Sequence, residues 1–134
     1  MHKTYRFGDL VEKYIDNRGK TPPLSEDGIP LLEVKHLPVE GKYPSLQTSK
    51  HVSQDVYDNW FRAHLEAGDI LFSTVGTTGR VAITPKNKKV AIAQNVLGLR
   101  FKPSLFDPAY AFYYLRAKPF QHEIESRLIT TVQA

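Results

Sequence analysis

Ile70 and Phe72 alternate with Leu71 and Ser73 in an apolar run, and Val81 and Ile83 resume this period of two after a polar segment. A period of two is typical of β-strands. The polar segment between the two runs contains Gly76 and Gly79, and glycine adopts the backbone angles that a tight turn needs. The pattern therefore predicts a hairpin. Its tip carries three polar side chains, Thr77, Thr78 and Arg80.

Apolar residues at helical spacing predict several helices along the chain. The first spans residues 7–15, whose apolar side chains fall mainly on one side. Another begins after Ser53, whose hydroxyl is suited to cap a helix. A third runs over residues 109–116 after an Asp-Pro start. The last covers residues 120–128, where apolar residues recur four positions apart.

Short apolar runs at residues 28–34, 90–93 and 96–101 predict further strands. Together with the hairpin and the helices, they predict an α/β (α+β) fold with a twisted, largely antiparallel sheet and flanking helices. The chain has 134 residues, of which 41% are hydrophobic. This length suffices for one hydrophobic core and is too short for two. We therefore expect residues 1–134 to form a single domain.

The composition excludes several classes of protein. Without cysteine, the chain has no disulfide framework and no cysteine-based zinc site. Its histidines show no metal-ligand spacing, and its first residues lack the apolar core of a signal peptide. No apolar run is long enough to cross a membrane. These observations predict a cytoplasmic protein with no metal site.

The positive charge is regional. The formal net charge is +4, yet residues 1–67 carry nine Lys and Arg against ten Asp and Glu, whereas residues 68–134 carry nine against four. A basic excess confined to one part of a chain favours a polyanionic partner such as nucleic acid. The alternative for the cluster Lys86, Lys88 and Lys89 is simple solvation of a turn.

Polar and basic side chains at predicted strand ends and loops are the candidates for contact with DNA. Arg and Lys bind guanine O6 and N7, Asn and Gln bind adenine N6 and N7, and Thr contacts a thymine methyl group or a phosphate. The candidates are Arg18, Lys20, Lys35, His36, Thr77, Thr78, Arg80, Gln94 and Asn95. Each of them alone has an ordinary alternative as a solvated or turn-forming residue. As a group they favour a surface that binds nucleic acid.

One motif is similar to a methyltransferase site. Asp107-Pro108-Ala109-Tyr110 resembles the Asp-Pro-Pro-Tyr motif with which amino-methyltransferases hold a target base. The chain has no glycine-rich turn between a strand and a helix that could bind S-adenosylmethionine. Helix capping by the Asp-Pro pair explains the same residues.

A second motif is similar to a nuclease site. Glu33-Val34-Lys35 on a strand, with Asp27 upstream, resembles the metal-binding core of many restriction nucleases. Pro30 interrupts the spacing, and the Pro-Asp start of that core is missing. We therefore expect no catalytic residue in the chain. A small Mg²⁺-dependent nuclease built on Glu33 and Lys35 remains an alternative, and so does a protein-interaction domain without DNA contact.

Several short motifs follow one another in a characteristic order. They are Gly19-Lys20-Thr21-Pro22, Gly28-Ile29-Pro30, Val34-Lys35-His36-Leu37, Leu65 with Gly68-Asp69-Ile70-Leu71, the Gly76 to Arg80 tip, residues 93–100 and residues 110–116. In this order they resemble the target recognition domain of a type I restriction-modification specificity subunit, over nearly the whole chain. His36 departs from the family pattern, which commonly has an acidic residue there.

The resemblance implies a role in sequence-specific DNA binding. Such a domain reads one half of a bipartite target in double-stranded DNA, without being an enzyme. Methyltransferase (M) subunits and a restriction (R) subunit are the implied partners, and these use S-adenosylmethionine, ATP and Mg²⁺, so the chain itself needs no cofactor. The family's long spacer helix is missing before Ala134, so the chain resembles an N-terminal recognition domain alone. Base-reading residues vary within the family, and none is carried over.

Overall fold

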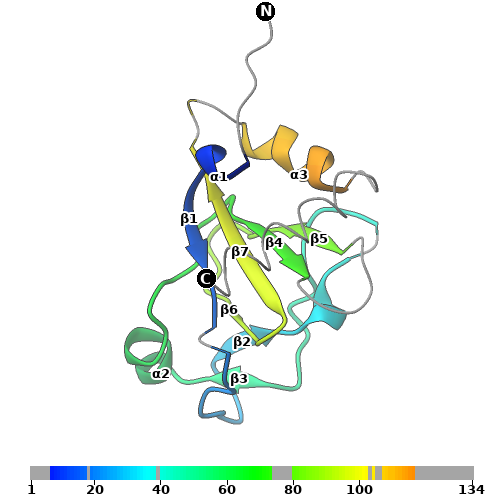
Figure 1. The fold of residues 1–134 in the computed structure, drawn as a ribbon. Coiled ribbons are helices and arrows are strands. Elements are labelled where there is room, and N and C mark those ends of the chain that lie inside the picture. The colour runs from blue at the N-terminus through cyan, green and yellow to red at the C-terminus, as the bar shows by residue number, and fades with distance from the viewer. Residues whose placement is uncertain are drawn as a thin grey trace, which may run out of the picture.

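The computed structural model describes residues 7–17, 19–38, 40–73, 80–102, 104 and 107–116. Within them the strands form two sheets (Figure 1). The larger sheet is four-stranded and antiparallel. Its strands, in spatial order, are β1 (Val11–Ile15), β7 (Val96–Phe101), β4 (Ile70–Ser73) and β5 (Val81–Ile83). The largely antiparallel sheet expected from the sequence is confirmed, and the predicted hairpin corresponds to β4 and β5.

The smaller sheet is three-stranded, in the order β3 (His51–Val52), β2 (Ile29–Leu32) and β6 (Ala91–Ile92). Strand β2 pairs antiparallel with β3 and parallel with β6, with Leu31 opposite Ala91 and Leu32 opposite Ile92. Parallel strands finish at the same edge of a sheet. The residues that follow β2 therefore lie beside those that follow β6, although they are far apart in the sequence.

The helices cap and cover these sheets. They are α1 (Phe7–Leu10), the 3₁₀ helix η1 (Val34–His36), α2 (Gln54–Asn59) and α3 (Pro108–Arg116). The expected cap of α2 is present, because the Ser53 hydroxyl accepts the Val56 N–H at 3.2 Å. Asp107 caps α3 by accepting the Tyr110 N–H at 3.3 Å. The predicted helix over residues 120–128 lies outside the described residues.

The larger sheet is covered on both faces, with α3 at one end of the molecule in Figure 1 and the smaller sheet towards the other. The core beneath α3 includes Ile70, Phe72, Leu99, Phe112 and Leu115. The core between the sheets includes Ile15, Leu32, Leu71, Ala82 and Ile92. A third cluster, beside α2, includes Leu31, Val52, Tyr57, Phe61 and Ala91. This layering explains why all four residues of β4 are buried.

The prediction of a helix over residues 7–15 was wrong beyond the first turn. Helix α1 ends at Leu10, and the chain continues as strand β1, paired with β7. The pairing shifts register between Val11 and Lys13, which marks a β-bulge. As a result Val11 packs beneath α3 while Ile15 packs between the sheets. The bulge interrupts the period of two, so the apolar spacing imitates a helix.

An ion pair inside the structure links the start of β4 to β7. Asp69 is 3% exposed, and Arg100 donates to it from Nε to Oδ1 and from Nη2 to Oδ2, both at 2.9 Å. The hydrogen bond to Asp69 is the main cause that raises the pKa of Arg100. Asp69 Oδ2 also accepts the backbone N–H of Glu66 at 2.8 Å. The pair therefore joins β7 to the start of β4 and to the turn before β4.

Among the described residues no helix is long and apolar enough to span a bilayer.

We expect Asp69→Asn to lower the free energy of unfolding by about 3 kcal/mol, because it removes the buried carboxylate charge that pairs with Arg100. Chemical denaturation at pH 7 measures the change. Glu66→Gln is the matched control, because it removes a second carboxylate charge near Arg100. The Glu66 side chain is 70% exposed, and its Oε2 is 3.5 Å from Arg100 Nε. The control should shift stability by less than about 1 kcal/mol. Equal effects of the two variants would contradict the account.

Candidate nucleic-acid interface

A pocket of about 410 Å³ opens at the edge where β2 and β6 end. Its wall comes from four separate parts of the chain: the loop after β1, β2 with the segment that follows it, the residue before β3 and the segment after β6. The polar side chains that line it are Asn17, Thr21, Glu33, Lys35, Lys50, Gln94 and Asn95. The structure thus brings together Lys35, Gln94 and Asn95 among the residues predicted to contact DNA.

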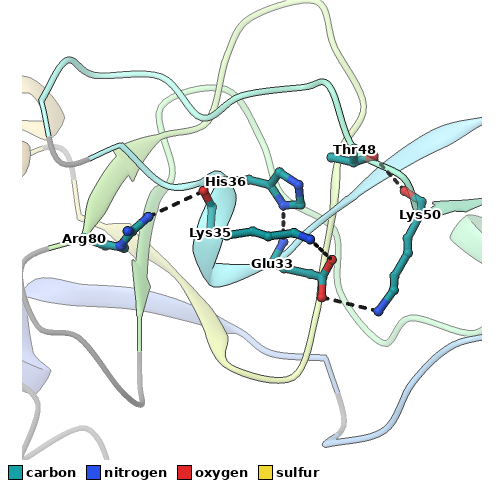
Figure 2. A network of polar contacts seen from close by, with 6 residues as sticks. All are labelled: Glu33, Lys35, His36, Thr48, Lys50 and Arg80. Carbon is teal, nitrogen blue, oxygen red and sulfur yellow. Dashed lines mark hydrogen bonds and ion pairs between the residues drawn. The ribbon is translucent and has the colours of Figure 1, made fainter.

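Glu33 lies between two lysines in this pocket (Figure 2). Its Oε2 is 3.4 Å from Lys50 Nζ, and its Oε1 is 3.9 Å from Lys35 Nζ. Oε1 is buried and accepts no hydrogen bond within the described part of the chain. The side chains of Lys35 and Lys50 are 67% and 44% exposed, against 27% for Glu33. The arrangement places a carboxylate between two ammonium groups.

The backbone after Leu32 turns into η1 and does not continue as the predicted strand, so the Glu33-Val34-Lys35 motif is not on a strand. The Glu33 N–H donates to His36 Nδ1 at 2.9 Å, and the His36 N–H donates back to the Glu33 carbonyl at the same distance. These bonds satisfy polar groups that a longer β2 would have paired with a neighbour.

His36 is buried, with 7% of its surface exposed. Burial is the main cause that lowers the pKa of His36, with the Glu33 carboxylate acting in the opposite direction. A neutral ring leaves Nδ1 able to accept the Glu33 N–H. This placement favours His36 as a support for the turn, and a contact between His36 and DNA stays a prediction.

Arg80, at the start of the β5 side of the hairpin, reaches back to η1. Its Nη1 donates to the carbonyls of Leu37 at 3.0 Å and Val34 at 3.4 Å. Figure 2 shows its third contact, with the Lys35 carbonyl at 3.5 Å. Arg116 of α3 holds the neighbouring stretch, since its Nη2 donates to the carbonyls of Val81 at 2.9 Å and Pro38 at 3.5 Å. Two arginines therefore fix the backbone beside the pocket.

The other predicted contact residues either lie near the pocket or fall outside the described residues. The Lys20 N–H donates to Asn17 Oδ1 at 3.2 Å, which places Lys20 beside the pocket wall. Gln94 is exposed and donates from Nε2 to Thr21 Oγ1 at 3.2 Å. The remaining candidates, Arg18, Thr77 and Thr78, lie outside the described residues.

Sequence reasoning missed Asn17, Glu33 and Lys50 as members of this surface. Asn17 is 2% exposed, and its Nδ2 has no hydrogen-bond partner within the described residues. Its neighbours in the pocket come from distant parts of the sequence, so no local motif marks it. Glu33 was weighed only as a nuclease residue, because a carboxylate counts against DNA binding when charges are simply summed.

Some of the basic residues in the second half of the chain bind other groups of the protein. Arg80 and Arg116 bind backbone carbonyls, and Arg100 pairs with Asp69. The lysine cluster Lys86, Lys88 and Lys89 is exposed in the connection that enters β6. Because the pocket lies where β6 ends, this cluster is at the opposite edge of the smaller sheet. Net charge alone therefore does not locate the surface.

Comparison with known proteins decides the family. The sequence matches the type I restriction modification DNA specificity domain over residues 2–133. The chain belongs to this family. The resemblance found from the ordered motifs is confirmed. The type I specificity domain is the non-catalytic, DNA-specificity part of its system, which also confirms that the chain is not an enzyme. None of the curated proteins compared matches the chain.

Solved structures of type I specificity proteins share the fold. The crystal structure of the HsdS subunit from Thermoanaerobacter tengcongensis is similar with a TM-score of 0.57 and 21% identity, covering 84% of this chain and 26% of that one. A second structure, described as the basis of complex assembly and conformational transition of the type I R-M system, has a TM-score of 0.55 and 18% identity. The match covers 84% of this chain and 27% of that one. The chain thus spans about a quarter of their length.

We expect Arg80→Ala to lower the free energy of unfolding by about 1–2 kcal/mol, because a charged donor to the η1 carbonyls is lost. Lys88→Ala, which removes the same charge from an exposed turn, should change it by less than about 0.5 kcal/mol. Thermal or denaturant unfolding of both variants measures the difference.

DNA affinity measured on the same folded variants separates the possible roles of Arg80. A purely structural role leaves affinity intact. A phosphate contact lowers affinity evenly across sequences and reduces the salt slope by about one unit, whereas a guanine contact relaxes preference at one base pair. Unchanged stability of Arg80→Ala would contradict the role that the hydrogen bonds indicate.

Proposed function

We propose that the chain binds double-stranded DNA sequence-specifically and reads one half of a bipartite target for a type I restriction-modification complex. The observation that carries this proposal is the pocket edge at the ends of β2 and β6. There Lys35, Gln94 and Asn95, each a candidate from the sequence, meet in a chain of the DNA-specificity family.

The chemistry of this edge suits the major groove. Each base pair displays its own pattern of hydrogen-bond donors and acceptors there, so a reader needs both kinds of group within a small area. Lys35 and Lys50 supply donors, the Glu33 carboxylate supplies acceptors, and the amides of Gln94 and Asn95 supply both. In the proposal Lys20, beside the pocket wall, contacts a phosphate, and such contacts position a protein without reading sequence.

The partners follow from the role of a specificity domain. We propose that the complete subunit joins M subunits and an R subunit in the cytoplasm, and that a second recognition domain reads the other half of the target. S-adenosylmethionine, ATP and Mg²⁺ are used by those partners in this proposal, and no cofactor is held by the chain. Methyl transfer and cleavage then depend on where this domain places the complex on DNA.

A protein-interaction role is the second candidate, and α3 carries the observation that favours it. Phe112 and Leu115 face the sheet, while Tyr110, Tyr113 and Tyr114 are 61%, 57% and 39% exposed. Tyrosine is enriched in protein interfaces.

The nuclease alternative has no such support. The charged groups nearest the Glu33 carboxylate are lysines, and no group of three or more potential metal ligands gathers in the described residues.

We expect the chain to bind duplex DNA weakly and with strong salt dependence. If about four to six phosphates are contacted, the slope of log affinity against log salt should be roughly −4 to −5. Fluorescence anisotropy of a labelled duplex at several salt concentrations measures this slope. A shallow response would favour the protein-interaction alternative.

The same samples incubated with S-adenosylmethionine or with Mg²⁺ serve as the control for activity. The DNA should remain unmethylated and intact. Nicking that disappears in Glu33→Ala would instead support the nuclease alternative.

A further inference from the structure

The Glu33 carboxylate has an acceptor that the described part of the chain leaves unused. Oε1 is buried and accepts no hydrogen bond there, and the 3.9 Å to Lys35 Nζ is longer than a hydrogen bond. A buried acceptor without a partner is unfavourable. Oε1 is covered in the free chain, so a ligand N–H reaches it only when a neighbouring side chain such as Lys35 moves aside, and the new bond then supplies the missing partner.

The two lysines do not form a tight ion pair with this carboxylate. Lys50 Nζ is 3.4 Å from Oε2, and both lysine side chains are more exposed than Glu33. Loose, exposed ion pairs contribute little to stability. The cluster is therefore poorly explained as a structural bridge, whereas the ammonium groups can move to acceptors of an incoming ligand.

The backbone that carries Glu33 is fixed on both sides. The Glu33 N–H is bonded to His36, and the carbonyl of the next residue, Val34, accepts from Arg80. These bonds hold the Cα of Glu33 in place relative to the pocket. Sites that recognise a hydrogen-bond pattern need this kind of support.

We propose that Glu33 is a specificity-determining residue that accepts a hydrogen bond from the exocyclic amino group of a base in the major groove. This inference rests on the proposed DNA-binding function and adds the group that is read. Cytosine N4 and adenine N6 are the amino groups displayed there, next to acceptors on guanine or on adenine and thymine. Lys35 and Lys50 donate to those neighbouring acceptors. A thymine O4 or guanine O6 facing Glu33 places two acceptors together and is rejected.

The test begins with selection of duplexes from a randomised library by the wild-type chain, Glu33→Ala and Glu66→Ala. Glu66→Ala is the matched control, because it removes one carboxylate from a side chain that is 70% exposed and does not line the pocket. We expect the wild type and Glu66→Ala to select the same motif. Glu33→Ala should lose about tenfold discrimination at a single position that is cytosine or adenine in that motif.

The second arm changes the DNA and leaves the protein intact. Adenine at the selected position is replaced by purine, or cytosine by 2-pyrimidinone, so that only the amino group is lost. The wild-type chain should bind about tenfold more weakly, while Glu33→Ala should show no further loss. The base whose replacement matters tells adenine N6 from cytosine N4. If Glu33→Ala does not fold, Glu33→Met takes its place, because methionine keeps the length of the side chain and removes both carboxylate oxygens.

Three results would overturn the proposal, and they are distinguishable. An unchanged motif in Glu33→Ala, with affinity raised evenly as in Glu66→Ala, would mean that Glu33 only offsets lysine charge. Insensitivity of the wild type to amino-group removal at every adenine and cytosine of the motif would overturn it without any variant. Retention of no duplex by the wild type would refute the proposed DNA binding as well.

Discussion

The parallel pairing of β2 with β6 is the constraint on which the candidate interface depends. It sets Leu32 beside Ile92, so the two chain segments that leave these strands emerge at one edge of the smaller sheet. Glu33 and Lys35 follow one strand, and Gln94 and Asn95 follow the other. The pairing is in turn fixed by burial, because one face of this sheet packs on the larger sheet and the other packs beside α2.

The edge is supported by groups that do not themselves reach the pocket. His36 accepts the Glu33 N–H, Arg80 binds the carbonyls of η1, and Arg116 binds the carbonyl of Pro38. Arginine suits this task because its guanidinium carries several donors in a rigid plane. Two of the arginines that raise the basic character of the sequence, Arg80 and Arg116, thus act as supports for the backbone. The surface that we propose to meet DNA is mixed in charge and rich in hydrogen-bonding groups.

Much of the fold could be predicted from local patterns. The β4–β5 hairpin, β7, the Ser53 cap and the start of α3 near Asp107 depend on residues close in sequence, and each was expected. Strand β1 was missed because a bulge after Val11 breaks its alternation. The division into two sheets was missed because strand order is set by contacts between distant residues. The ordered motifs identified the family where single motifs could not.

The candidate site was predictable only in part, for a related reason. Lys35, Gln94 and Asn95 were found because basic and amide side chains at strand ends suit base edges. Asn17 and Lys50 reach the same pocket through tertiary packing, which no local spacing encodes. An arginine at a hairpin looks the same in sequence whether it binds DNA or backbone carbonyls, so the bonds of Arg80 to η1 could be recognised only in the structure.

The most direct test of the central claim is a backbone amide NMR titration of the chain with duplex DNA. The account predicts that the largest chemical-shift changes occur at the amides of Glu33, Lys50 and Gln94, which border the pocket from three different segments. Lys88 and Lys89, at the opposite edge of the smaller sheet, should change less. The largest changes at those lysines or along the exposed tyrosines of α3, with the pocket amides unmoved, would contradict the account.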